Sequence, residues 1–453
     1  MLNKLSKQLL GLFPDTEACP RLNEEKTMKM ARKAVALGAI GIVGVLALAG
    51  CGRTDETPTG EGPSAAAIDD APATGEITIW AMGEEGENLG DFADAFIEEN
   101  PDATVTVTSI PWADVMTKYQ TAVAAGTVPD AIMIGSSLLP SMVAAGGLAP
   151  VPDGVVDTAT LNETAAESTT VEGVSYAVPW YVETRVLYYR SDLAEAVGLS
   201  APTSWDELTA FAEGFTAEGA EYGLQLPMGD AEDSTQVVLP FYAQAGGEVL
   251  NDAGDAYAWD HDALVAALEY YGSFFTGGLA PLSGYGDSQT ASFTDGSNPA
   301  FISGPWMVSV LADMKDADWV AENVATVPVP AGSSNNDSYL GGGHLGVFAD
   351  AKNADGAWKL IRWLAEADTQ EAWFELTSGL PAVTSVLDGF TSDPRVSVLG
   401  EQLQNTVAPP SVPSWDEMSA FIETEAEKVA NGSSAEDAAT AIEAKAESLG
   451  TGW

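Results

Sequence analysis

The sequence is poor in basic residues. Its 453 residues include 18 lysines and arginines against 67 aspartates and glutamates, which gives a formal net charge of −49. Seven of the basic residues lie in residues 1–50, so 11 basic residues face 63 acidic ones from residue 51 onward, a net charge near −52. Such a surface repels nucleic acids and anionic lipid headgroups, and it favours a soluble, monomeric protein.

Cysteine and histidine are also scarce, with two of each. Cys19 and Cys51 both lie in a segment that processing would remove or modify, so we expect no disulfide. His261 and His344 are far apart in sequence, whereas metal sites need clustered ligands. No H-E-x-x-H, Walker A or G-x-S-x-G motif occurs. In so acidic a chain, carboxylate pairs suited to glycoside hydrolysis arise by chance, so the sequence offers no positive support for an enzyme.

Residues 1–50 are predicted to be a signal peptide. Three basic residues precede an apolar run, 34–50, which is too short for a stable membrane span. The run ends in Leu48-Ala49-Gly50-Cys51, which resembles the bacterial lipobox, whose cysteine is diacylated. Because residues 1–27 contain acidic residues, Met28 or Met30 is the more natural start. The alternative is a cleaved secretory signal with an incidental cysteine.

Residues 51–75 are predicted to be a lipidated cysteine followed by a flexible tether. The segment is rich in Gly, Pro, Ala, Thr and acidic residues and has scarcely a large apolar side chain. A lipid anchor, a tether and a globular body place that body on the extracellular face of the cytoplasmic membrane.

The body begins with a pattern typical of an α/β sheet. Strands are predicted at 76–82, 103–110 and 131–134, with helices between them. Ligands of such parallel sheets bind beyond the carboxyl ends of the strands. The candidate residues at these ends are Met82, Glu84, Trp112 and Ser136.

The densest aromatic stretch runs from Tyr176 to Asp192. In an extended segment Tyr181, Glu183 and Arg185 share one face, and the last two lie roughly 6–7 Å apart. Both could hydrogen-bond a polyhydroxylated ligand stacked on Trp180 or Tyr181. The alternative is a crossing strand whose aromatic residues pack in the core and whose charges merely pair.

Gly341, Gly343 and Gly346 match the spacing of a dinucleotide-binding fingerprint. We reject this function because residues 345–348 continue as a strand, whereas the fingerprint needs a helix at that point. Glycines here would bring bare backbone close to a ligand or let the chain cross between domains. His344 is either a ligand contact or a satisfied polar residue. Two further segments, Ser204 to Glu207 and Ser414 to Glu417, share a sequence that predicts capped helix starts.

Several landmarks occur together in order. They are the lipobox, Val178-Pro-Trp180, Leu187-Tyr-Tyr189, the Pro-Thr-Ser-Trp-Asp-Glu helix start, Ala243-Gln-Ala-Gly-Gly247, Ser303-Gly-Pro-Trp306, Ala357-Trp358 and Leu380-Pro381-Ala382. Over residues 76–453 the chain resembles the family 1 extracellular solute-binding proteins of ABC importers, the group that includes the maltose-binding protein.

The resemblance implies a periplasmic-binding-protein-like α/β fold of type II, with two lobes joined by hinge strands around a ligand cleft. Lobe one would comprise 76–183 plus 324–368, and lobe two 184–323 plus 369–453. It also implies a carbohydrate ligand, permease partners, no catalysis and no cofactor. The implied cleft residues are Met82, Glu84, Trp112, Ser136, Trp180, Tyr181, Glu183, Arg185, Trp306, Gly342, Gly343, His344, Trp373 and Trp415.

The sequence departs from the maltose-binding protein in most sugar-contacting positions outside Trp306, so the resemblance does not name the sugar. The abundance of aromatic residues favours a di- or oligosaccharide over an amino acid. The alternatives are another small solute, such as a polyamine, glycerol phosphate or a peptide, and a secreted glycoside hydrolase.

Overall fold

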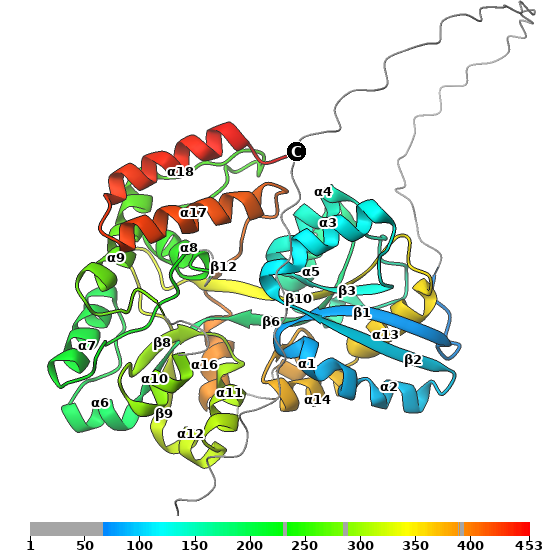
Figure 1. Cartoon of the computed structure of the whole chain (residues 1–453), viewed down its shortest axis with the longest axis horizontal. Coiled ribbons are helices and arrows are strands. Elements are labelled where there is room, and N and C mark those ends of the chain that lie inside the picture. The colour runs from blue at the N-terminus through cyan, green and yellow to red at the C-terminus, as the bar shows by residue number, and fades with distance from the viewer. Residues whose placement is uncertain (1–66, 230–232, 284–288, 388, 390–393) are drawn as a thin grey trace, which may run out of the picture. The chain divides into compact units, whose positions relative to one another are not determined.

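The computed structural model describes residues 67–229, 233–283, 289–387, 389 and 394–453 (Figure 1). The expected signal peptide, Cys51 and most of the tether lie outside these residues, and so does the side chain of Glu84. In the ranges described, no helix combines the length and the apolar character that crossing a membrane requires.

Lobe one is built on a sheet of seven described strands in the order β11-β6-β10-β3-β1-β2, with β12 beside β10. The parallel strands β1 (Gly75–Met82), β2 (Ala103–Ile110) and β3 (Ala131–Gly135) confirm the three strands predicted from the sequence. The two long strands β6 (Val178–Thr184) and β10 (Ser338–Val347) run antiparallel to each other, and β10 is also antiparallel to β3.

Helices cover this sheet and bury its apolar side chains. The predicted helix before Asn100 divides at Ala93 into two pieces and ends ahead of Pro101, which disfavours a helical residue before it. The helices are α1 (Gly83–Phe92), α2 (Asp94–Glu99), α3 (Val115–Ala125), α4 (Leu139–Ala145), α5 (Glu163–Ser168), α13 (Ala354–Leu364) and α14 (Ala367–Thr377).

Lobe two has a smaller antiparallel sheet in the order β8-β7-β9. Its strands are β7 (Val186–Arg190), β8 (Ala300–Ser303) and β9 (Val324–Val327). Its helices are α6 (Ser191–Val197), α7 (Trp205–Ala217), α8 (Thr235–Gln244), α9 (His261–Thr276), α10 (Gln289–Asp295), α11 (Met307–Met314), α12 (Ala317–Asn323), α17 (Trp415–Ala430) and α18 (Ala435–Leu449).

Short elements complete the described chain. They are η1 (Trp112–Asp114), η2 (Ser136–Leu138), η3 (Thr158–Thr160), β4 (Thr170–Val171), β5 (Val174–Ser175), β11 (Leu380–Pro381), α15 (Thr384–Leu387), α16 (Pro394–Gln402) and β12 (Thr406–Val407).

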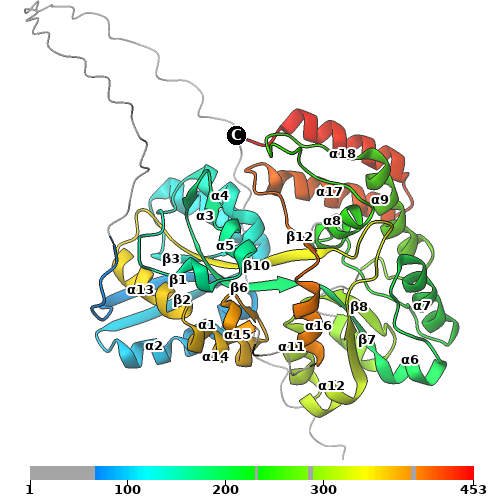
Figure 2. The same cartoon turned by 180° about the vertical axis from the view of Figure 1, so that it is seen from behind.

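The chain crosses between the two sheets at β6, which is separated from β7 by Arg185 alone. It returns through β10, and Figure 2 shows both strands running between the two groups of helices. The fold class inferred from the sequence, two α/β lobes joined by crossing strands, is therefore confirmed.

The expected lobe boundaries differ from the structure in two stretches, residues 324–327 and the segment from residue 369 through β11, which pairs with β6. Residues 324–327 form β9, which pairs with β7, so the return to lobe one begins at β10 and not at residue 324. Helix α14 was expected in lobe two, but its Trp373 packs in the core of lobe one. Both differences arise because strand pairing and side-chain burial, and not sequence order, decide which lobe a segment joins.

Candidate functional site

Arg185 occupies the crossing between the two sheets. Its side chain is buried, its Nη2 donates to Glu183 Oε1 at 3.2 Å, and its Nε donates to Gln236 Oε1 at 3.0 Å. Its guanidinium lies 4.5 Å from the ring centroid of Trp306. Because Glu183 belongs to β6, Gln236 to α8 and Trp306 to the start of α11, Arg185 joins the crossing strand to two helices of lobe two.

Tyr181 is buried on β6 beside these charges. Its hydroxyl shares a hydrogen bond with the Glu85 side chain. Burial, together with the negative charges of Glu85 and Glu183, raises the pKa of Tyr181 well above its ordinary value. The hydroxyl therefore stays protonated and remains a donor as well as an acceptor near neutral pH.

Trp112 lies at the carboxyl end of the lobe-one strands, as the sequence predicts, and 43% of it is exposed. It packs against Gly83, where a Cβ atom would lie 2.8 Å from Trp112 Nε1 and 3.4 Å from Glu85 Oε2. Gly83 also has a φ of +56°, a conformation that glycine adopts most readily. Glycine at this position thus brings the indole and the Glu85 carboxylate close together.

Together these residues form a polar and aromatic strip that we call the crossing band. It runs from an indole of lobe one to an indole of lobe two, through two carboxylates, a phenol and a guanidinium. Its members are Trp112, Glu85, Tyr181, Glu183, Arg185 and Trp306.

The glycines of β10 make room for the band. A Cβ at Gly343 would lie 2.3 Å from Tyr181 Cε1, and one at Gly341 would lie 2.5 Å from Glu183 Oε1. Gly342 has a φ of +152° and approaches the Tyr181 carbonyl oxygen closely. Gly341, Gly343 and Gly346 all lie inside β10, which confirms that they are not a dinucleotide fingerprint.

His344 follows the glycines and is 1% exposed. Its Nε2 lies 3.1 Å from Ser168 Oγ. Burial lowers the pKa of His344 to about 4, so the ring is neutral near pH 7. A neutral imidazole can act as both donor and acceptor toward a ligand or water.

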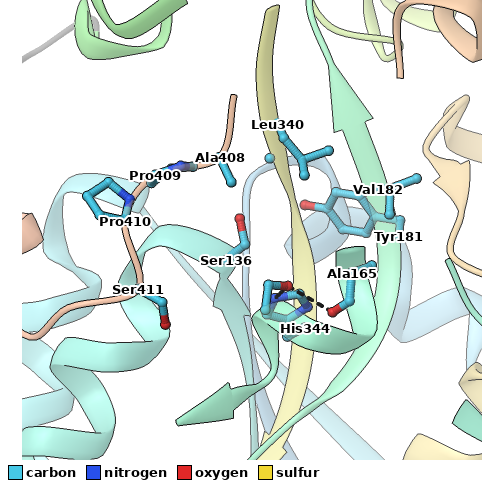
Figure 3. A pocket seen from close by; sticks show the side chains of 12 residues that line it. Ser136, Ala165, Tyr181, Val182, Leu340, His344, Ala408, Pro409, Pro410 and Ser411 are labelled. Atoms are coloured by element: carbon cyan, nitrogen blue, oxygen red, sulfur yellow. Dashed lines mark hydrogen bonds between the residues drawn. The ribbon is translucent and has the colours of Figure 1, made fainter. Parts of the chain in front are cut away.

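Tyr181 and His344 also line a small pocket with Ser136 (Figure 3). Other walls come from α5, from Val182 and Leu340, and from the segment after β12; these are Ala165, Ser168, Gly341, Ala408, Pro409, Pro410 and Ser411. The volume is about 30 Å³, which admits only a few water molecules. A sugar ring does not fit in this pocket as the structure has it.

Three predicted tryptophans lie in the hydrophobic core and not at the band. Trp180 is 1% exposed and packs against Trp373 with ring centroids 4.7 Å apart. Trp415 is 2% exposed in the core of lobe two. Their assignment to the ligand surface is corrected on this ground, because neighbouring side chains cover their ring faces. Met82 is also fully buried, although it ends β1 next to Gly83.

Several neighbours of the band and pocket have no signal in the sequence. Glu85 follows the predicted strand end by three residues and is one acid among many, whereas Gln236 and Ser168 lie on helices whose orientation the sequence does not fix. The dipeptide Pro409-Pro410 does mark a loop, and that signal could have drawn attention to the segment after β12.

Metal binding has no candidate in the described ranges, because no group of three or more His, Cys, Asp or Glu side chains there could hold an ion. The carboxylates, phenol and guanidinium of the band can hydrogen-bond the polar groups of a ligand.

The sequence profile of the family described as "Bacterial extracellular solute-binding protein" matches residues 91–398. The chain belongs to this family. Among its relatives is the diacetylchitobiose binding protein DasA of Streptomyces coelicolor, 26% identical over 439 residues that cover 91% of this chain and 97% of the relative. A maltooligosaccharide ABC transporter solute-binding lipoprotein of Streptococcus pneumoniae is 24% identical over 411 residues, covering 86% and 90%.

The solved structures agree. The GacH receptor of Streptomyces glaucescens, determined unliganded and in complex with acarbose, matches this solute-binding protein with a TM-score of 0.75 and 25% identity. The match covers 83% of this chain and 98% of the receptor. The family recognised from the sequence is thus confirmed, and its members are extracellular binding proteins.

Proposed function

We propose that this solute-binding protein captures a di- or oligosaccharide at the crossing band and delivers it to the permease of an ABC importer. The composition of the crossing band is the main support for this function. It offers an indole at each end, one per lobe, on which sugar rings can stack, and charged or phenolic groups between them that can bind hydroxyls. The oligosaccharide names of the relatives support this ligand class.

The ligand contacts proposed here combine the band with its neighbours. From the sequence-based set they are Glu84, Trp112, Ser136, Tyr181, Glu183, Arg185, Trp306, Gly342, Gly343 and His344, without the buried Met82; Glu85 joins them because it hydrogen-bonds Tyr181. The glycines would offer backbone groups, and the neutral His344 would serve as donor or acceptor.

Binding would proceed by closure of the lobes. The pocket is too small for a sugar ring, so the lining segments must separate to admit one and close around it afterwards. A ligand that touches both lobes only in the closed state shifts the population toward that state. Arg185 would move little, because it donates hydrogen bonds both to Glu183 on β6 and to Gln236 on α8.

Cys51 would carry the lipid anchor and hold a monomer on the outer face of the cytoplasmic membrane. The lipobox resemblance and the lipoprotein name of the pneumococcal relative support this placement.

Titration calorimetry with a panel of di- and oligosaccharides tests the proposal. We expect tight 1:1 binding of at least one sugar, which is then recovered intact. Binding of a polyamine, glycerol phosphate or a peptide, with no response to any sugar, would overturn it. Recovery of shortened sugar would instead indicate a glycoside hydrolase.

A further inference from the structure

The end of the tether is bound to lobe one. Ala73 is fully buried, and its backbone N–H donates to Asn100 Oδ1 at 2.7 Å. Asn353, which caps α13, donates from Nδ2 to the Thr74 carbonyl oxygen at 2.9 Å. Ile68 packs against the lobe-one core. We call residues 68–75 the strap.

Two ion-paired clusters join the strap to α13. Lys359 Nζ lies 2.7 Å from Asp69 Oδ1 and 2.8 Å from Asp355 Oδ2, and only 8% of its side chain is exposed. Arg362 Nη1 lies 3.0 Å from Asp70 Oδ1, and its Nη2 donates to the Asp69 carbonyl oxygen at 2.7 Å. Both acidic side chains of the strap therefore have cationic partners on one helix.

The scarcity of basic residues limits the places on the body where the strap can form ion pairs. Only 11 basic residues accompany 63 acidic ones after residue 50, so most of the surface repels a segment that carries two aspartates. Helix α13 places two of those 11 cations one turn apart on the side that the strap follows.

The strap also enters the sheet at a defined place. Gly75 is the first residue of β1, and Met82 is the last. A strand rises about 3.3 Å per residue, so about 23 Å separates the two ends. Since the crossing band lies at the carboxyl ends of the strands, the strap joins the sheet at the amino ends, opposite the candidate site.

We propose that α13 is a docking surface for the strap, which fixes the anchored end of the chain to lobe one. A lipid anchor on Cys51 would then be joined to lobe one through the strap, and lobe two would move relative to lobe one when the lobes close. The docking itself depends on the ion pairs and the buried Ala73, and it does not depend on which solute is bound.

Hydrogen exchange of the full chain in detergent, followed by mass spectrometry of peptides that cover residues 71–75, tests the docking. We expect these amides to be protected at low salt. Exchange should become about tenfold faster in the double variant Lys359→Gln/Arg362→Gln. The reciprocal variant Asp69→Asn/Asp70→Asn should act alike without altering the nearly buried Lys359. In 0.5 M NaCl the wild type should move toward the variants.

Lys352→Gln is the matched control, because it removes a charge from an exposed side chain just before α13 and should leave strap exchange unchanged. Solute affinity should be equal in all variants, so a failed sugar assignment would not affect the result. Unprotected exchange in the wild type, or wild-type exchange in both double variants, would overturn the docking.

Discussion

The guanidinium of Arg185 lies over the indole of Trp306, 4.5 Å from its ring centroid, and also donates to Glu183 and Gln236. One side chain thus holds a strand of the crossing, a helix of lobe two and a partly exposed aromatic ring in a fixed arrangement. A cation over the ring, together with the close approach of Gly304 to its six-membered part, fixes the orientation of the indole.

Arg185→Ala should lower both solute affinity and stability. It leaves the carboxylate of Glu183, whose side chain is 15% exposed, without its cation, and such losses in buried pairs cost about 3–5 kcal/mol. Urea unfolding and calorimetry on the same sample measure both effects. Arg185→Lys keeps the charge but not the forked geometry, so it should recover stability more than affinity. Wild-type affinity in Arg185→Ala would remove this residue from the site.

Trp306→Ala and Trp180→Ala should have opposite effects. Loss of stacking at Trp306 should weaken binding by about 1–3 kcal/mol with little change in melting temperature. Trp180 is buried against Trp373, so its removal should cost about 3–5 kcal/mol of stability and leave the affinity of the folded fraction unchanged. Trp319→Ala is the control, since Arg190 lies 5.0 Å over its ring in lobe two, outside the band. If Trp180→Ala weakened binding and Trp306→Ala did not, Trp180 and not Trp306 would belong to the binding site.

Gly343→Ala should impair binding without a change of charge. Its Cβ would lie 2.3 Å from Tyr181 Cε1, so the phenol must move away from Glu85. Gly90→Ala is the matched control, because its Cβ would meet nothing nearer than 4.0 Å. Calorimetry should show weaker binding for the first variant only. Equal affinities would show that the position of Tyr181 does not matter to the ligand.

The two histidines should make stability depend on pH in opposite directions. The pKa of His344 is lowered to about 4 by burial, so its contribution is complete above about pH 6.5 and falls by about 3 kcal/mol as the pH drops to 4. Glu443 and Glu436 raise the pKa of His261. Its contribution is present below pH 6.5 and is lost as the pH rises through the folded-state pKa.

Urea unfolding of His344→Gln and His261→Gln between pH 4 and 9 separates the two. As the pH falls, the wild type should lose stability relative to His344→Gln. The variant His261→Gln should be less stable than the wild type at acidic pH and equally stable at basic pH. Parallel curves for both variants would contradict the opposite pKa shifts.

Cys51→Ala should release the protein from membranes and leave solute affinity unchanged, because the tether separates anchoring from binding. Fractionation followed by calorimetry on the released protein measures both. If the variant stays on the membrane after the signal peptide has been cleaved, the lipobox interpretation is wrong.

Two copies of one tetrapeptide show the limit of local sequence. Ser204 caps α7 by accepting from the Glu207 backbone N–H, and the Glu207 carboxylate reaches back to Thr203. Ser414 instead donates its hydroxyl to the Gly450 carbonyl oxygen, while Glu417 pairs with Lys445 on α18. The same four residues start a helix in both places, but their side chains make different contacts because α18 packs beside only one copy.

The sequence by itself determined the strands of lobe one, the helix starts, the strand nature of residues 341–346 and the family, because alternation, capping and glycine spacing act over a few residues. Only the tertiary structure decided that Trp180 is covered by Trp373 while Trp306 stays partly exposed, that Glu85 meets Tyr181, and that β9 belongs to lobe two. Each of these depends on a partner far away in the chain, and the burial of a side chain follows from packing and not from its own chemistry.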